Sequence, residues 1–192
     1  MRNFILILLI FALNSCAVKE LKPIKRYDLT VDNTISNTTS RHKNKILKVA
    51  YPISLSMPLS YKIKYSYENG DSGYYLNSIY GSNLSQQLNG FIIRTLSKAN
   101  IFKTVLPYQS NAIEDYRLEV VVNKFYHKID SSGSWAVIDI GFNLLDANTN
   151  KIIKSRVFSY KKPTPTVDAN GFIIATKEAL KELSSDLVNW LK

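Results

Sequence analysis

The chain has 192 residues, of which 45% are hydrophobic, which suits one domain with a single hydrophobic core. Its formal charge is +10, but no recognised nucleic-acid-binding motif accompanies the charge, so we expect no nucleic-acid partner; anionic lipid head groups or an acidic protein partner fit better. The single cysteine excludes an internal disulfide framework.

The first fifteen residues predict a bacterial lipoprotein signal peptide. Arg2 supplies a positive charge, and an apolar run over residues 4–13 follows, which is too short to span a membrane because a span needs about twenty residues. The run ends in Leu13-Asn14-Ser15-Cys16, which resembles the lipobox. Cleavage before Cys16 would make it the lipidated N-terminus. The alternative is an ordinary secretory signal with a chance cysteine.

The residue after the cysteine predicts the destination of the lipoprotein. In diderm bacteria, Asp at this position retains lipoproteins in the inner membrane, whereas this chain has Ala17. We therefore expect a lipid-anchored protein on the periplasmic face of the outer membrane.

Residues 16–44 predict a basic tether between the lipidated cysteine and the folded domain. Over residues 32–44 the one aliphatic side chain is Ile35, so this stretch cannot bury enough apolar surface to order itself. Residues 27–31 form a short apolar interruption that reads as a first strand docked onto the domain. We expect the α+β domain itself over residues 45–192.

The next segment predicts a tyrosine-rich hairpin. A strand is predicted over residues 46–51. Residues 61–67 then alternate with period two, with three tyrosines and Ile63 on one face and the lysines on the other. The Glu68-Asn69-Gly70-Asp71 turn follows, and a return strand covers residues 74–80. This hairpin region contains six tyrosines: Tyr61, Tyr65, Tyr67, Tyr74, Tyr75 and Tyr80.

Apolar residues then change to helical spacing over residues 83–99, and Asn83 with Gln86 resembles a capping box at the start of this helix. A short buried strand is predicted over residues 101–107, where Pro107 ends it.

The C-terminal part predicts an antiparallel meander with strands over residues 116–122, 136–144 and 152–160, followed by an amphipathic helix over residues 173–191. A sheet with one apolar face and two amphipathic helices to cover it gives the expected fold class. This class is α+β, a two-layer domain with a mostly antiparallel sheet covered by two helices.

The sequence offers little catalytic chemistry. His42 and His127 are the two histidines, and neither has a companion at metal-ligand spacing, so we expect no metal. No nucleophile elbow, phosphate-binding loop or dinucleotide motif is visible, so we expect neither an enzyme nor a cofactor. Five carboxylates are spaced as solvent-facing residues of strands and turns, and we interpret them as solvated or paired with lysines: Asp115, Glu119, Asp130, Asp139 and Asp146.

Aromatic residues are the remaining candidates for function, because tyrosine and tryptophan give large amphipathic contact areas at interfaces. The alternative is that the tyrosines are ordinary strand residues and that Trp135 caps a hairpin. The candidate partner-binding residues are Tyr61, Tyr65, Tyr67, Tyr74, Tyr75 and Trp135.

Several phrases resemble the ABC-type transport auxiliary lipoproteins of the paraquat-inducible protein C type, which accompany mammalian cell entry (MCE) lipid transport systems. The phrases are Tyr27-Asp28-Leu29, the segments 115–120 and 142–147, and the closing helix at 179–184. The chain departs from the family in its basic, Asn-rich segment before Ile46 and in having no Trp before the first helix.

The resemblance implies an accessory lipoprotein in the outer membrane that docks onto a periplasmic MCE-domain protein and an ABC permease complex and positions them. It brings no catalytic residues to this chain. Because MCE proteins form rings, it also implies a homo-oligomeric ring of unspecified size. The alternative function is a stand-alone envelope lipoprotein that binds lipid or peptidoglycan.

Overall fold

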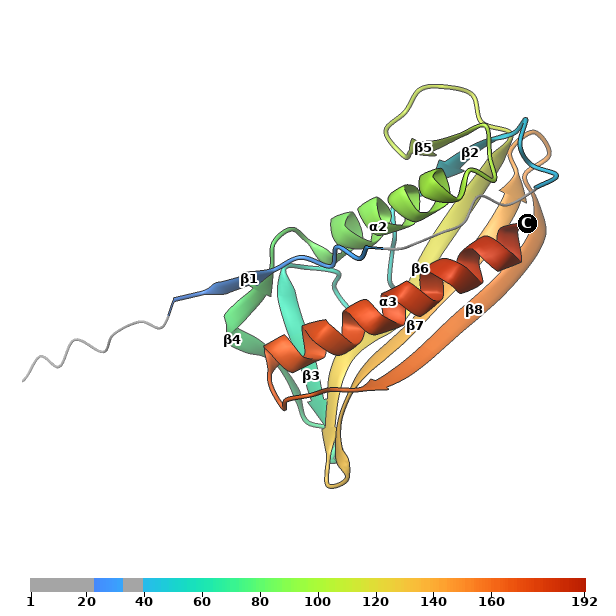
Figure 1. Ribbon diagram of the computed structural model, residues 1–192. Coiled ribbons are helices and arrows are strands. Elements are labelled where there is room, and N and C mark those ends of the chain that lie inside the picture. The colour runs from blue at the N-terminus through green and yellow to red at the C-terminus, as the bar shows by residue number, and fades with distance from the viewer. Residues whose placement is uncertain (1–22, 33–39) are drawn as a thin grey trace, which may run out of the picture.

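The computed structural model describes residues 23–32 and 40–192 (Figure 1). The expected signal peptide and the lipidation site Cys16 lie outside the described residues. Within the described ranges, no helix is long and apolar enough to cross a membrane.

One eight-stranded sheet and two helices form the described part of the chain. The helices are α2 (Leu84–Ala99) and α3 (Ala169–Leu191). The strands are β1 (Lys25–Tyr27), β2 (Ile46–Val49), β3 (Lys62–Tyr67), β4 (Ser72–Tyr80), β5 (Thr104–Pro107), β6 (Tyr116–Asp130), β7 (Gly133–Asp146) and β8 (Lys151–Pro163).

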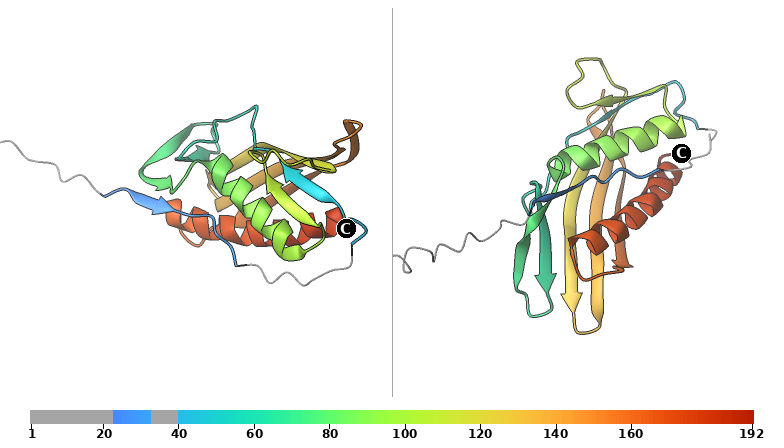
Figure 2. Two further views of the ribbon diagram at one scale, coloured as in Figure 1. Left: turned by 90° about the horizontal axis from the view of Figure 1, so that it is seen from above. Right: turned by 60° about the vertical axis from the view of Figure 1, so that its left-hand side comes forward.

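Strand β6 is the central strand of the sheet and pairs with strands on both of its sides. On one side it pairs with β7, and β7 pairs with β8, which confirms the predicted antiparallel meander. On the other side β6 is shared by two short groups of strands: β2 with β5 pairs near its start, and β3 with β4 and β1 pairs near its end (Figure 2). The long ladders are antiparallel, as expected, whereas the short pairings β1–β4, β2–β5, β2–β6 and β3–β6 are parallel.

A β-bulge lets the fifteen-residue strand β6 face the helices along its whole length. Leu118, Val120 and Val122 point inward in the first half, and Phe125 and His127 point inward in the second. The change from even to odd positions coincides with the register shift between Val122 and Lys124. A bulge adds one residue and so moves the alternation by one position.

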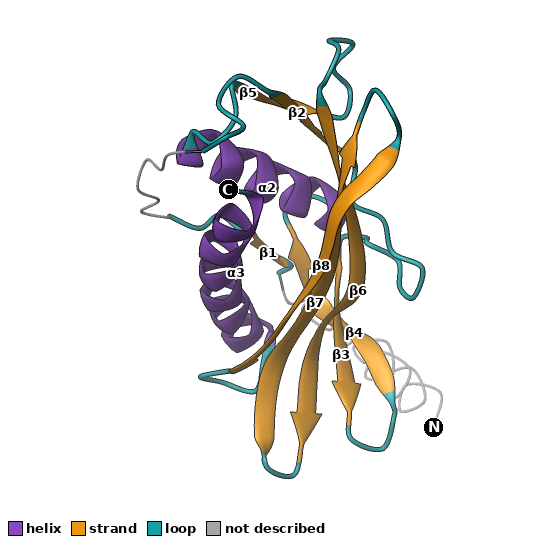
Figure 3. Ribbon diagram, turned by 90° about the vertical axis from the view of Figure 1, so that its right-hand side faces the viewer, coloured by secondary structure: helices purple, strands orange, loops and turns teal. Residues whose placement is uncertain are grey.

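The two helices cover the same face of the sheet (Figure 3). Helix α2 starts as predicted, because the Asn83 side chain accepts a hydrogen bond of 2.8 Å from the N–H of Gln86. Helix α3 starts at Ala169, earlier than the predicted Ile173, since the Asp168 side chain accepts a 2.8 Å hydrogen bond from the Gly171 N–H. The core lies between these helices and the inner side chains of the sheet.

Strand β5 differs from the prediction of a buried strand over residues 101–107. The buried side chains Ile101 and Phe102 precede the strand, which begins at Thr104 and is partly exposed. They pack in the turn after α2, where burial does not need a strand. The predicted range 101–107 therefore covers two features, a buried turn and a short strand that is partly exposed.

The folded body also begins before the expected boundary at residue 45. Strand β1 pairs with Ser78–Tyr80 of β4, and Leu29 is buried with 1% of its surface exposed. His42 is buried too, and its ring stacks on that of Phe102 at 5.5 Å. The described parts of the segment expected as a tether, residues 23–32 and 40–44, thus include strand β1 and the buried side chains Leu29 and His42.

Candidate functional site

Four of the expected contact residues line one open groove. Tyr65, Tyr67, Tyr74 and Tyr75 line a groove of about 450 Å³ together with Leu76, Asn77, Ser78, Ile129 and Val167. The ring of Tyr65 lies 5.4 Å from that of Tyr67 and 5.3 Å from that of Tyr75, in edge-to-face arrangements. Tertiary structure thus gathers β3 and β4 tyrosines beside the loop that leads into α3.

The remaining aromatic candidates lie elsewhere. Tyr61 is 49% exposed just before β3. Trp135 lies at the start of β7, with the Lys161 ammonium 4.2 Å from its ring centroid. Tyr80, the last tyrosine of the hairpin, is a core residue with 1% of its surface exposed. The predicted tyrosines therefore do not form one continuous surface.

A second groove of about 320 Å³ adjoins the first. It shares Tyr75, Asn77 and Ser78 with the tyrosine groove, and Pro23, Lys25, Tyr27 and residues 168–170 complete it. We call the two together the β4-edge groove. Strand β1 pairs with β4 at Ser78–Tyr80, so the outer edge of residues 72–77 has no strand partner among the described residues.

His127 lies beneath the groove, which its sequence position at a presumed strand end did not reveal. The Tyr75 hydroxyl and His127 Nδ1 are 2.7 Å apart, and the imidazole stacks on Phe172 at 5.6 Å. Burial lowers the pKa of His127 to about 4 and raises the pKa of Tyr75 to about 12. At neutral pH the imidazole is therefore neutral and the tyrosine protonated, and the two groups share a hydrogen bond. This pair links Tyr75, which lines both parts of the groove, to the buried His127.

The sheet face opposite the helices carries ordered rows of side chains across β6, β7 and β8. Asp139 accepts hydrogen bonds from Asn123 at 2.8 Å and from Ser159 at 2.6 Å. Beyond it, Val121, Gly141 and Val157 are cross-strand neighbours and form an apolar row. We call this surface the open sheet face, since no described helix covers it (Figure 3).

A parallel polar row borders the apolar one. Asn143 donates to Glu119 at 3.2 Å and accepts from Ser155 at 2.6 Å. The side chains of both polar rows thus hydrogen-bond to one another across the strands of the open sheet face. Such a face suits contact with another protein surface better than it suits a reaction.

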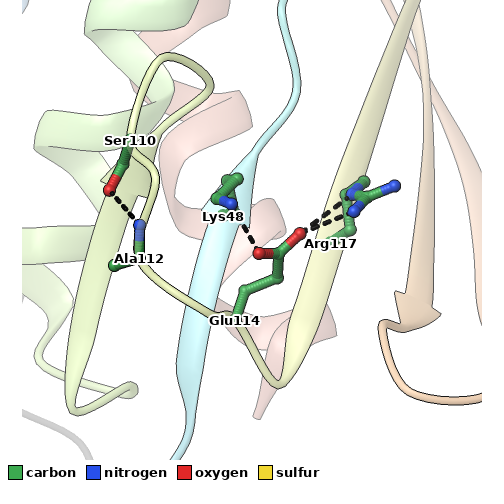
Figure 4. A network of polar contacts seen from close by, with 5 residues as sticks. All are labelled: Lys48, Ser110, Ala112, Glu114 and Arg117. Atoms are coloured by element: carbon green, nitrogen blue, oxygen red, sulfur yellow. Dashed lines mark hydrogen bonds and ion pairs between the residues drawn. The ribbon is translucent and has the colours of Figure 1, made fainter.

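Ion pairs centred on the buried Glu114 hold the loop between β5 and β6 in place (Figure 4). Glu114, 8% exposed, accepts from Lys48 Nζ at 2.5 Å and from Arg117 Nη2 at 2.6 Å. The hydrogen bond from Lys48, with a further one from Arg117, lowers the pKa of Glu114 to about 2. The same loop turns where the Ser110 hydroxyl accepts from the Ala112 N–H at 3.2 Å. We interpret this cluster as structural.

The other carboxylates singled out in the sequence are engaged locally. Asp115 pairs with Lys45 at 3.0 Å, Asp130 pairs with Lys128 at 3.2 Å, and Asp146 caps a turn. No group of three or more metal-ligand side chains occurs in the part of the chain that the structure describes.

Fold and site together define a class of protein: a small two-layer α+β domain with a groove at one sheet edge and an open sheet face. The family model described as "ABC-type transport auxiliary lipoprotein component" matches residues 27–188. The chain belongs to this family, which confirms the resemblance seen in the sequence.

Solved structures agree with the fold. Protein XCC0632 from Xanthomonas campestris, described as DUF330, is similar with a TM-score of 0.76 and 21% identity, over 86% of this chain and 94% of that chain. An uncharacterized protein is similar with a TM-score of 0.67 and 16% identity, over 89% of this chain and 100% of that chain. A comparison with curated proteins gave no match.

Proposed function

We propose that this protein is an outer-membrane lipoprotein that docks onto an MCE-type ABC lipid transport system and positions it, without catalysing a reaction. Membership of the auxiliary lipoprotein family carries this proposal. The described residues add supporting geometry, namely the β4-edge groove, the open sheet face and the local pairs of Asp115, Asp130 and Asp139.

The proposed anchor is Cys16, whose thiol receives diacylglycerol before residues 1–15 are cleaved. Two or more acyl chains hold a protein on a membrane far more firmly than one chain. We expect the wild-type chain in the outer-membrane fraction of a density gradient. Cys16→Ala, which can be neither acylated nor cleaved at this site, should be absent from that fraction. Ala17→Asp is a matched variant that should move the acylated protein to the inner membrane. Wild type that sediments with the inner membrane would contradict the proposed address.

The proposed transporter-binding surface is the open sheet face, with Trp135 at its rim. Its Val121-Gly141-Val157 row is apolar, and Val157 is 55% exposed. A periplasmic MCE-domain protein, or the permease complex behind it, is the proposed partner. The rows of paired side chains would present the same surface to the partner in every copy.

Photo-crosslinking tests this surface. A photoreactive residue at Val157 should form adducts with transporter subunits in native membranes. The same residue at Ile113, 85% exposed in the loop between β5 and β6, is the control and should form fewer. Adducts between copies of this chain, seen at multiples of its mass, would support the proposed homo-oligomeric ring. Equal crosslinking from both positions would contradict docking through the open sheet face.

A further inference from the structure

The N-terminal chain leaves the folded domain at the β4-edge groove. Pro23, Lys25 and Tyr27 line the groove, and the Tyr27 carbonyl accepts a 2.8 Å hydrogen bond from the Gly81 N–H. Figure 1 places β1 and β4 on the same side of the molecule as the start of α3. The exit point of the chain is therefore fixed to this side of the sheet.

The chain between that exit point and the proposed anchor is short. Cys16 lies seven residues before Pro23, a stretch that spans at most about 25 Å when fully extended. The fifteen-residue strand β6 is itself about 50 Å long at the usual rise per residue. An acylated Cys16 would consequently hold the groove side of the domain nearer the bilayer than the end that carries β5.

The groove presents large side chains that a membrane interface accommodates. Leu76 is 89% exposed, Val167 is 64% exposed and Tyr67 is 46% exposed, and all three line the tyrosine groove. Ile24, beside the exit point, is 56% exposed. Tyrosine suits the interface because its ring is apolar and its hydroxyl remains hydrated.

The charge of the adjoining chain favours an anionic lipid surface. Between Cys16 and Tyr27 the sequence has one acidic residue, Glu20, against four basic ones: Lys19, Lys22, Lys25 and Arg26. Basic residues next to a membrane anchor are attracted by anionic lipids. The acidic residue in the groove, Asp168, is committed to capping α3 through the Gly171 N–H, and Lys25 also helps to lower its pKa.

We propose that the β4-edge groove rests on the anionic membrane surface beside the lipid anchor, with Leu76 and Val167 inserted at the level of the lipid head groups. This inference rests on the proposed function, because it takes acylated Cys16 as the anchor. An added strand from another protein on the open edge of β4 is the other occupant that the fold admits. The short connection to Cys16 and its basic flank favour the lipid surface.

Lipid quenching of a site-specific fluorophore tests the proposal. The acylated full chain with Leu76→Cys carries one free thiol, because Cys16 is modified, and that thiol is labelled with an environment-sensitive fluorophore. The protein is reconstituted in vesicles of phosphatidylethanolamine and phosphatidylglycerol that contain lipids spin-labelled at the head group. Val167→Cys is the second test position. Ile113→Cys, with nearly the same exposure as Leu76, is the control.

We expect quenching at positions 76 and 167 to exceed quenching at position 113 at least threefold, and to weaken when phosphatidylglycerol is omitted. Equal quenching at the three positions, in protein that floats with the vesicles, would overturn the inference and leave the anchor intact. Failure of the protein to float would overturn both. Crosslinking of position 76 to a partner protein in native membranes, without quenching in pure lipid vesicles, would assign the groove to a protein strand instead.

Discussion

The side chain of Gln87 on α2 accepts a 2.6 Å hydrogen bond from the backbone N–H of Leu29. The same carboxamide donates to the Tyr27 carbonyl at 3.1 Å. One buried glutamine therefore satisfies the backbone on both sides of Asp28 and holds the N-terminal segment on the domain. This contact fixes where the chain leaves toward the proposed anchor.

Gln87→Ala should release the N-terminal segment while the rest of the domain stays folded. A buried N–H left without a partner costs about 1–3 kcal/mol, so hydrogen exchange in residues 23–32 should accelerate about tenfold or more. Mass spectrometry of exchanged peptides measures this. Gln86→Ala, at the exposed neighbouring position, is the matched control and should change exchange little. Unchanged exchange in Gln87→Ala would show that β1 pairing alone holds the segment.

Two glycines on the helices should respond in opposite directions to alanine. A Cβ at Gly171 would collide with the backbone carbonyl of Thr166, so Gly171→Ala should lower the free energy of unfolding by about 1–3 kcal/mol. A Cβ at Gly90 would meet the flexible Arg94 guanidinium at 3.0 Å, so Gly90→Ala should raise it by about 0.5–1 kcal/mol. Urea unfolding measures both. Equal effects would contradict the close packing of the loop before α3.

Glu114 should contribute to stability in a defined pH range. Its pKa falls from 4.5 to about 2 on folding, so its contribution is complete above about pH 5 and is lost as the pH falls toward 2. Glu114→Gln should therefore lower the free energy of unfolding at pH 7 by about 2 kcal/mol and converge with the wild type near pH 2. Glu178→Gln on the exposed side of α3 is the control. A pH-independent difference would contradict the ion cluster.

His127 should make the domain sensitive to acid. Its pKa falls from 6.5 to about 4 on folding, so the unfolded chain binds a proton first and stability declines as the pH falls from about 6.5 to 4. His127→Phe should flatten this part of the profile of melting temperature against pH. Tyr75→Phe, which removes the hydrogen bond but keeps the imidazole, should retain it. The same slope in wild type and His127→Phe would assign the acid sensitivity to His42, whose pKa burial also lowers.

Local patterns predicted the helices and the meander well. Asn83 marks the start of α2 through its own side chain, and the alternation in β7 continues unbroken from Trp135 to Leu144. The predicted strand at 116–122 stopped early because the bulge after Val122 shifts the alternation, although β6 continues to Asp130. A pattern of period two ends at a bulge even where the strand does not.

Long-range pairing was beyond the reach of these patterns. The parallel pairing of β1 with β4 joins residues more than fifty positions apart. The backbone of Leu29 is bonded by Gln87, and the amphipathic pattern of α2 does not single out this glutamine. The groove could not be predicted for the same reason. Val167 and Tyr67 reach it from opposite halves of the chain.

Co-purification from native membranes in mild detergent tests the central claim most directly. Tagged wild type and Cys16→Ala are extracted in parallel, and bound proteins are identified by mass spectrometry. We predict that wild type recovers MCE-domain and ABC permease subunits and that the unanchored variant recovers them in much lower yield. Recovery of neither subunit with wild type, under conditions that preserve a known periplasmic complex, would contradict the role as a transport auxiliary.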